Sequence, residues 1–137
     1  MEIVLKAGSL LERTHEIILT STSREGYPRP CVVTKCKSEG IRRFWVATGS
    51  NSVKVRHFME NPKAGACFYQ NGHSVTLTGK VKLQKNPDIK AQMWVDWFIN
   101  HFPGGVEDPN YCLLEFTTEE AILWIDSEFI TVGRELL

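Results

Sequence analysis

The sequence predicts a mainly β protein with added helices, in which about six or seven antiparallel strands form a closed or nearly closed barrel. The first observation is that short β-branched and apolar runs recur along the chain, separated by turn-forming residues. The second is Asn71-Gly72, which stands between two such runs and is the strongest hairpin signal in the sequence. Because hairpins imply antiparallel pairing and closure protects sheet edges, we expect a barrel.

The composition predicts one compact domain that spans residues 1–137. Hydrophobic residues make up 42% of the chain and charged residues 23%, which is enough for a core and unlike a disordered segment. Lys plus Arg and Asp plus Glu number 16 each, so we expect neither nucleic-acid nor membrane binding. No apolar run approaches the roughly 20 residues that span a bilayer, and the N-terminus lacks a signal-peptide pattern, so a cytoplasmic location is expected.

The elements of the N-terminal half follow from the β-branched runs and the turns between them. We expect a short helix at 5–13, strands at 16–22, 30–37 and 43–48, and turns at 23–26 and 38–40. After the third strand, Ser52 is a suitable N-cap for a short helix. Asn61-Pro62 ends this helix, because a residue before proline avoids helical dihedral angles.

The C-terminal half begins with the hairpin around Asn71-Gly72. Its arms are predicted at 64–70 and 74–83, and the second arm alternates apolar and polar residues, as a strand with one buried face does. A longer helix rich in aromatic residues is expected at 89–98, followed by an irregular loop at 102–109. The last predicted strands are 111–117 and 121–125.

A strand that runs into a helix N-terminus is the one candidate binding site that the residues themselves indicate. Thr48, Ser52 and Lys54 surround this junction, where unpaired backbone N–H groups and the positive end of the helix dipole favour an anion. The spacing is not that of a P-loop, so ordinary helix capping is the alternative interpretation. The pattern indicates a phosphate site with Lys54 as its cation.

An ordered set of motifs, from about residue 10 to residue 134, resembles the pyridoxamine 5′-phosphate oxidase-like FMN-binding split-barrel family. The set comprises Arg29 at the head of a strand, Thr48-x-x-x-Ser52-x-Lys54, Glu60-Asn61-Pro62, an alternating strand with Gly79, Trp97-Phe98, Phe102-Pro103, Asp108-Pro109 and Trp124. More narrowly, the chain is similar to the general stress protein 26 branch. The resemblance implies a split barrel that binds FMN at a homodimer interface.

The resemblance also implies cofactor contacts within one subunit. Arg29 would contact the phosphate, with a solvated turn residue as the alternative interpretation. The remaining contacts implied are backbone groups of Val32, Val33 and Thr34 on the flavin ring, and Thr48, Ser52 and Lys54 on the phosphate and ribityl chain. Ser74 stands where the oxidases carry a glutamine that touches the flavin, so this contact is expected to be shortened or lost.

Two late residues match the contacts that the partner subunit makes in the family. Trp124 and Arg134 have the spacing of a tryptophan and an arginine that border the ring from the other subunit. The alternative makes Trp124 a core aromatic and Arg134 a tail charge. Between them the oxidases carry an Arg-x-His that holds substrate, whereas this chain has Ile130-Thr131-Val132. Because a phosphorylated vitamin needs cationic donors, pyridoxamine phosphate oxidation is not expected.

Other reactive residue types show no motif. The cysteines Cys31, Cys36, Cys67 and Cys112 are expected to be reduced, and a zinc site with His57, His73 or His101 lacks the usual short spacing, so no metal is expected. No histidine stands in a recognisable nucleophile motif. The aromatic residues Trp94, Trp97, Phe98 and Phe102 are interpreted as core, with cover for a flavin face as the alternative.

The function expected from the resemblance is an FMN-dependent oxidoreductase that exchanges electrons with a small-molecule donor or acceptor. The first alternative is a non-catalytic flavin-binding stress protein. The second is a split barrel that binds haem or a deazaflavin instead.

Overall fold

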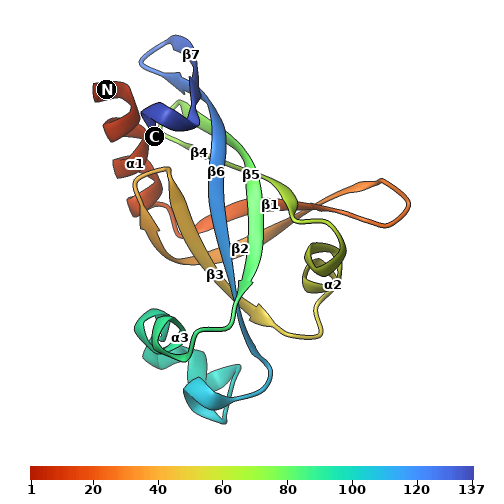
Figure 1. Cartoon of the computed structure of the whole chain (residues 1–137). Helices are drawn as coiled ribbons and strands as arrows, with labels where there is room; N and C mark the ends of the chain where they lie inside the picture. The colour runs from red at the N-terminus through yellow and green to blue at the C-terminus, as the bar shows by residue number, and fades with distance from the viewer.

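The computed structural model describes all 137 residues, which form one seven-stranded antiparallel sheet with helices at its ends. The strands are β1 Glu16–Thr22, β2 Pro28–Glu39, β3 Arg43–Gly49, β4 Lys63–Gln70, β5 His73–Gln84, β6 Tyr111–Ile125 and β7 Glu128–Gly133. They lie in the order β3-β2-β1-β4-β5-β6-β7, and pairing of β3 with β6 closes six of them into a barrel (Figure 1). The predicted antiparallel split barrel with flanking helices is therefore confirmed.

Helices lie at both ends of the barrel and against one side of it (Figure 1). They are α1 Glu2–Arg13, α2 Val53–Glu60, α3 Pro87–Met93 and the 3-10 helices η1 Asp96–Asn100, η2 Gly105–Glu107 and η3 Arg134–Leu136. Helix α1 lies near the β6–β7 turn, whereas α3 and the segment after it lie at the opposite end (Figure 1). None of these helices has the length and apolar character needed to cross a membrane.

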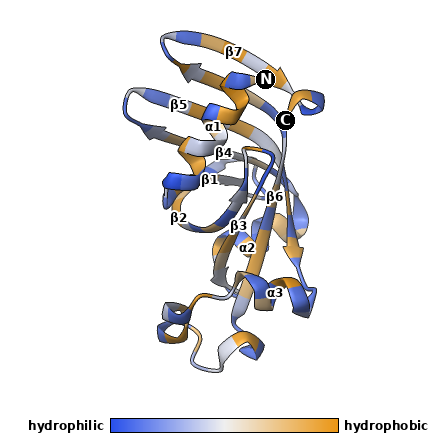
Figure 2. Cartoon of the chain, turned by 90° about the vertical axis from the view of Figure 1, so that its left-hand side faces the viewer, coloured by the Kyte–Doolittle hydropathy of each residue, from blue (hydrophilic) through white to orange (hydrophobic).

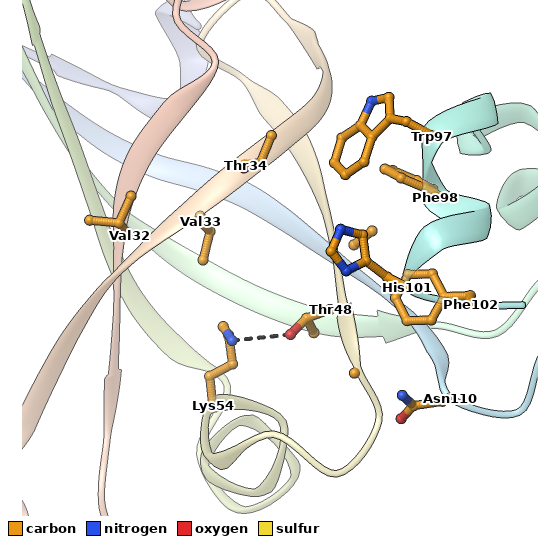
Figure 3. Close-up of a pocket in the computed structure, with 12 residues that line it drawn as sticks. Val32, Val33, Thr34, Thr48, Lys54, Trp97, Phe98, His101, Phe102 and Asn110 are labelled. Atoms are coloured by element: carbon orange, nitrogen blue, oxygen red, sulfur yellow. Dashed lines mark hydrogen bonds between the residues drawn. The ribbon is translucent and has the colours of Figure 1, made fainter.

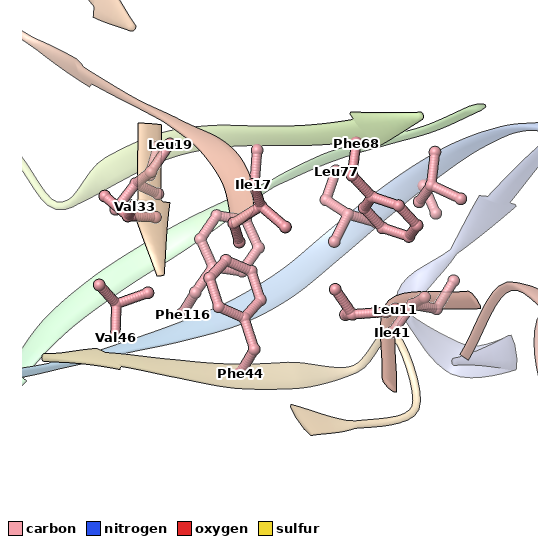
Figure 4. Packing of buried hydrophobic residues seen from close by; sticks show 14 of the residues in the cluster. Leu11, Ile17, Leu19, Val33, Ile41, Phe44, Val46, Phe68, Leu77 and Phe116 are labelled. Atoms are coloured by element: carbon pink, nitrogen blue, oxygen red, sulfur yellow. The ribbon is translucent and has the colours of Figure 1, made fainter. Parts of the chain in front are cut away.

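The barrel is filled by a cluster of 25 buried apolar side chains. Phe44 of β3 and Phe116 of β6 stack inside it, with ring centroids 4.7 Å apart (Figure 4). Apolar and polar residues alternate along the strands, because successive side chains point to opposite faces of a sheet (Figure 2). Leu11 of α1 and Ile41 of the β2–β3 turn are both 0% exposed, so the helix seals its end of the barrel.

A smaller apolar cluster lies at the other end, where α3 and η1 pack on the start of β6. Its buried members are Trp45, Met93, Phe98, Phe102, Tyr111 and Leu113. The aromatic rings meet largely edge-on, which is a favourable geometry for them. For example, the ring centroid of Trp94 lies 5.3 Å from that of Tyr111 and 5.5 Å from that of Phe98.

The predicted helix at 89–98 is wrong as one element. The structure has α3 up to Met93 and a separate η1 from Asp96, with Trp94 and Val95 in extended conformation between them. The carbonyl of Lys90, which a continuing helix would pair with the Trp94 amide, accepts the Tyr111 hydroxyl at 2.9 Å instead. The Trp94 amide donates to Ala91. A contact with a distant residue therefore ends the helix.

The end of the chain also differs from the sequence prediction. The strands expected at 111–117 and 121–125 are one continuous strand, β6, and β7 follows it where no strand was predicted. The polar residues between them stay in the strand because Thr118 is buried and its hydroxyl donates to the Ile41 carbonyl at 2.6 Å. Gly79 of β5 permits the close approach there, since a Cβ at this position would lie 2.0 Å from the Thr117 carbonyl oxygen.

The remaining differences concern element ends. Helix α1 begins at Glu2 rather than near residue 5, and β2 extends the predicted 30–37 strand to 28–39. Strands β4 and β5 meet at Asn71-Gly72 as predicted, with φ of 51° and 79° at these residues. Positive φ at both positions is what a tight turn matched to the strand twist requires.

Candidate functional site

Strands β2 and β3 separate along part of their length, and this split carries the site. Their pairing runs from Glu39↔Arg43 to Lys35↔Val46 and stops there. Beyond this point, residues 28–34 of β2 pair with β1 alone, and residues 47–49 of β3 pair with β6 alone. Along the split, therefore, the edge of β2 that faces β3 and the edge of β3 that faces β2 are both unpaired.

Two prolines explain why β2 has a free edge here. The Lys35 amide donates to the His15 carbonyl, on the β1 side, at 2.8 Å. Since main-chain groups alternate sides along an antiparallel strand, the N–H positions of residues 28, 30, 32 and 34 face away from β1. Pro28 and Pro30 occupy two of these positions and have no N–H to donate, as expected of an edge. The main chain of Val32 has both groups and directs them toward the split.

A cavity of about 430 Å³ opens in the split, between β2, β3, the start of α2 and the segment that follows α3 (Figure 3). Its size is within the usual range for a small-molecule or cofactor site. It is lined by Val32, Val33, Thr34, Ala47, Thr48, Gly49, Lys54, Trp97, Phe98, His101, Phe102 and Asn110. Polar groups and aromatic rings thus line the same cavity.

The polar end of the cavity is the junction of β3 and α2. The Lys54 ammonium donates to the Thr48 hydroxyl at 3.0 Å (Figure 3), and the Thr48 hydroxyl donates to that of Ser52 at 3.4 Å. Ser52 is the N-cap of α2 but its side chain makes no capping hydrogen bond, and the first turn of α2 contains no acidic residue. The free N–H groups and dipole of this helix end, together with Lys54, therefore favour an anion.

The turn between β3 and α2 is fixed to the start of β6. The Asn110 side-chain oxygen accepts the Ser50 amide at 3.1 Å and the Ser50 hydroxyl at 3.2 Å. Asp108 orders the same loop by accepting the amides of Asn110 and Gly104, and these bonds hold the pKa of its carboxyl below its usual range. The loop that leads into β6 is thereby tied to the anion end of the cavity.

The opposite wall is aromatic. Phe98 and Phe102 are buried, whereas Trp97 is 50% exposed and packs edge-on against Phe98 with centroids 4.7 Å apart. The sequence interpretation of these side chains as core is right for Phe98 and Phe102. The same residues also line the cavity, so core packing and a wall for a ligand are not exclusive here.

The charge in the cavity is positive. Lys54 and His101 are its ionisable lining residues, and no Asp or Glu lines it. Thiols nearby are not activated: burial raises the pKa of Cys36 to about 11 and also raises that of Cys112. Because a protonated thiol is a poor nucleophile, the arrangement favours binding of an anionic, partly aromatic ligand over covalent cysteine chemistry.

The structure brings part of the predicted residue set together. Val32, Val33, Thr34, Thr48 and Lys54 line the cavity, and Ser52 contacts Thr48. Arg29 is exposed and does not line it, but it pairs in register with Ser21, whose hydroxyl is 2.8 Å from His57 of α2. Arg29 therefore lies on the α2 side of the β1–β2 hairpin.

The other predicted residues lie elsewhere on the chain. Ser74 pairs with Trp124 in register, and Trp124 packs on Phe129 with centroids 4.5 Å apart. Arg134 begins η3 near the C-terminus. None of these three lines the cavity of its own chain. A contact with the ligand would require them to come from a second subunit.

Sequence reasoning did not select His101 and Asn110 as site residues. Both come from the irregular segment between α3 and β6, where no periodic pattern indicates which side chains turn inward. Pro28 and Pro30 are a signal that could have located the split, since Pro30 begins the predicted strand and Pro28 stands two residues before it, on the same side of an extended chain. The structure forms no cluster of three or more His, Cys, Asp or Glu that could hold a metal ion.

Comparison with known proteins identifies the family. The sequence matches the family described as "Pyridoxamine 5'-phosphate oxidase like" over residues 4–135, and the chain belongs to this family, as the motifs predict. Among curated proteins, no sequence matches the chain.

Solved structures share the fold at low sequence identity. One is a protein related to general stress protein 26 from Clostridium acetobutylicum, with a TM-score of 0.85 and 22% identity over 98% of this chain and 96% of that one. The general stress FMN/FAD binding protein from Xanthomonas citri has a TM-score of 0.77 and 19% identity over 96% and 94%. A haem binding protein from Mycobacterium smegmatis has a TM-score of 0.79 and 12% identity over 97% and 58%.

Proposed function

We propose that this member of the pyridoxamine 5′-phosphate oxidase-like family binds FMN in the β2–β3 split and acts as an FMN-dependent oxidoreductase. The observation that carries the proposal is the cavity itself. It combines a lysine at an uncapped helix N-terminus with an aromatic wall and has no acidic lining residue. A solved structure with this fold is named an FMN/FAD binding protein, which supports the same ligand class.

The residues present fit the chemistry of FMN. A phosphate needs cationic and N–H donors, which Lys54 and the first turn of α2 supply, and a ribityl chain needs hydroxyl partners such as Thr48 and Ser52. A flat ring needs apolar walls, which Val32 and Phe98 supply on two sides of the cavity. The polar edge of the ring needs main-chain hydrogen-bond partners, and the main-chain groups of Val32 face the split.

When bound, FMN supplies the hydride or electron transfer. The residues of this chain anchor and orient it. Lys54 holds the phosphate with charge-assisted hydrogen bonds, while the aromatic wall excludes water from one side. Residues 130–132 carry no cationic side chain, so the substrate is not expected to be a phosphorylated vitamin.

The first test is a visible absorption spectrum before and after FMN is added, followed by a binding titration. We expect about one FMN per chain, and Lys54→Ala is expected to weaken binding by about 1.5 to 3 kcal/mol, or roughly 10- to 150-fold. Arg56→Ala, on the same helix but outside the cavity, is the control and should bind as the wild type does.

The outcomes separate the alternatives. A colourless protein that fails to bind FMN contradicts the proposal. Bound FMN that is reduced by NADH or NADPH and turns over with an acceptor supports an enzyme, whereas bound FMN without turnover supports a non-catalytic flavin-binding protein.

We also propose a homodimer with the ligand at its interface. An outward-facing and mostly apolar row crosses the sheet in register, from Val32 at the cavity through Ile18, Cys67 and Thr76 to Ile122. Val32 is 70% exposed and Ile18 40% exposed. Exposed side chains of Tyr69 and Phe129 border this row. Because such a patch is costly in water and begins at the cavity, a second copy docked on it would approach the ligand.

Light scattering of the purified protein tests the dimer. The wild type should have the mass of two chains, and Ile18→Lys should reduce it to one and weaken FMN binding, because Trp124 and Arg134 of the partner are lost. Ser9→Lys, on the exposed side of α1, adds the same charge and should stay dimeric. A wild type with the mass of one chain contradicts the proposed interface.

Haem is the second candidate, and one observation favours it: His101 directs an imidazole into an aromatic cavity, and imidazole is a common haem ligand (Figure 3). A solved structure with this fold is named a haem binding protein. Titration with haemin, followed by the Soret band, distinguishes the two ligands. A stoichiometric Soret shift that competes with FMN would favour haem.

A further inference from the structure

The His101 side chain is exposed, packs against two aromatic rings and has no hydrogen-bond partner in the chain. Its ring meets Trp97 edge-on, with centroids 5.7 Å apart and planes at 84°, and lies 6.4 Å from the ring of Phe102. Among the four histidines, His57 is bonded to Ser21 and His73 accepts the Asp126 amide, whereas the rings of His15 and His101 have no partner. The ring of His15 does not line the cavity. His101 instead points into the cavity, which leaves both of its ring nitrogens free (Figure 3).

Two side chains that share the cavity with His101 offer donors. Asn110 uses its side-chain oxygen on Ser50, so its amide N–H groups are what it can offer to a ligand. Lys54, from α2, is the charged lining residue and is also a donor, whereas β2 and β3 contribute uncharged lining residues. A ligand with acceptor atoms on the side of His101 would be complementary to these donors.

We propose that His101 is a ligand-binding residue that donates an imidazole N–H hydrogen bond to an acceptor atom at the ring end of the bound flavin. This inference rests on the FMN function proposed above and assigns the two ends of the ligand. Lys54 and the α2 N-terminus hold the phosphate, and His101, from a different segment, contacts the ring. Flavin carbonyl oxygens are acceptors of the required kind.

The proposal predicts that the two ends of the cavity respond differently to two flavins. FMN carries a phosphate and riboflavin does not, but both carry the ring that His101 would contact. Removing the His101 donor should therefore weaken FMN and riboflavin by the same factor, on the order of 2- to 12-fold. Removing Lys54 should weaken FMN alone.

The experiment titrates FMN and riboflavin by flavin fluorescence quenching in the wild type, His101→Leu, His101→Gln, Lys54→Ala and His15→Leu. Leucine has no donor, whereas glutamine keeps an N–H donor. We expect His101→Leu to weaken both flavins by the same factor, with an unchanged near-UV circular dichroism spectrum, and His101→Gln to restore most of the affinity. Lys54→Ala should weaken FMN alone, and His15→Leu is the control that should bind as the wild type does.

Two outcomes would overturn the inference, and they are distinguishable. If FMN binds the wild type and His101→Leu equally well, or if His101→Gln binds it as weakly as His101→Leu does, His101 does not donate to the ligand and the FMN proposal stands. If FMN does not bind the wild type, the FMN proposal fails and the inference fails with it.

Discussion

At the α1 end of the barrel, the helix packs so tightly on the β2–β3 turn that a Cβ on Gly8 would lie 2.9 Å from the Gly40 Cα. Leu11 and Ile41 are fully buried there. At the opposite end, β2 and β3 part and the aromatic residues of η1 close only one side, which leaves a cavity of about 430 Å³. One end is packed and the other is held open.

The difference between the two ends shows that stability and ligand binding depend on different parts of this small barrel. The packed end and the Phe44–Phe116 stack have close neighbours on every side, so the loss of one side chain leaves a void. At the open end, Lys54 and His101 face a cavity, so their loss removes no buried packing. Substitutions in the core should therefore lower stability, whereas substitutions at the cavity should lower affinity.

The largest expected effect on stability is that of Phe44→Ala. Phe44 is 1% exposed and stacked on Phe116, so its removal should lower the free energy of unfolding by about 3 to 5 kcal/mol. Phe44→Leu, which keeps most of the volume, should lower it by about 1 kcal/mol. Urea unfolding of both variants measures the difference. Equal losses would show that the centre of the barrel is not packed as described.

A smaller effect is expected at Glu115, a buried carboxylate near the open end. It is 6% exposed and accepts Trp45 Nε1 at 2.9 Å and Gln84 Nε2 at 3.0 Å. Burial would raise the pKa of Glu115, but these bonds and the Lys82 ammonium outweigh it and lower the pKa below its ordinary value. Glu115→Gln should lower the free energy of unfolding by about 1 to 2 kcal/mol at neutral pH.

The sign of the pH dependence follows from the lowered pKa of Glu115. Stability from the ionised group is fully present above its unfolded-state pKa, and it is lost as pH falls through the lower folded-state pKa. The difference between wild type and Glu115→Gln should therefore shrink in acid. Glu119→Gln, which alters an exposed pair with Lys80, is the control. An equal pH profile for both variants would contradict the network.

The smallest effect is expected for Lys6→Met, at the packed end. The Lys6 ammonium contacts both carboxylate oxygens of Asp126 at 2.7 Å, but the two side chains are 44% and 62% exposed. Exposed pairs contribute little and are screened by salt. The thermal midpoint should change little in low salt and not at all in high salt. A large change that persists in high salt would show that this pair fixes α1 to the barrel.

Much of the fold could be predicted because its signals are local. Three signals depend on neighbouring residues: the alternation of apolar and polar residues in β5, the turn at Asn71-Gly72 and the end of α2 at Asn61-Pro62. Each of these elements lies where its signal predicts. The break after Met93 could not be predicted, because it depends on the hydroxyl of Tyr111, which lies 21 residues from Lys90 in the sequence. Likewise, β6 is continuous through Thr118 because of Ile41.

The candidate site likewise has one part that depends on local sequence and another that depends on tertiary structure. The sequence by itself determined the anion end, because Thr48, Ser52 and Lys54 lie within one strand-to-helix junction and need no distant partner to come together. The prolines of β2, which have no N–H to donate, also mark its free edge, although the sequence prediction did not draw on them. Only the tertiary structure decided that the edge parts from β3 and that His101 faces Lys54 across the gap. Those placements depend on long-range packing around Tyr111, which no local pattern encodes.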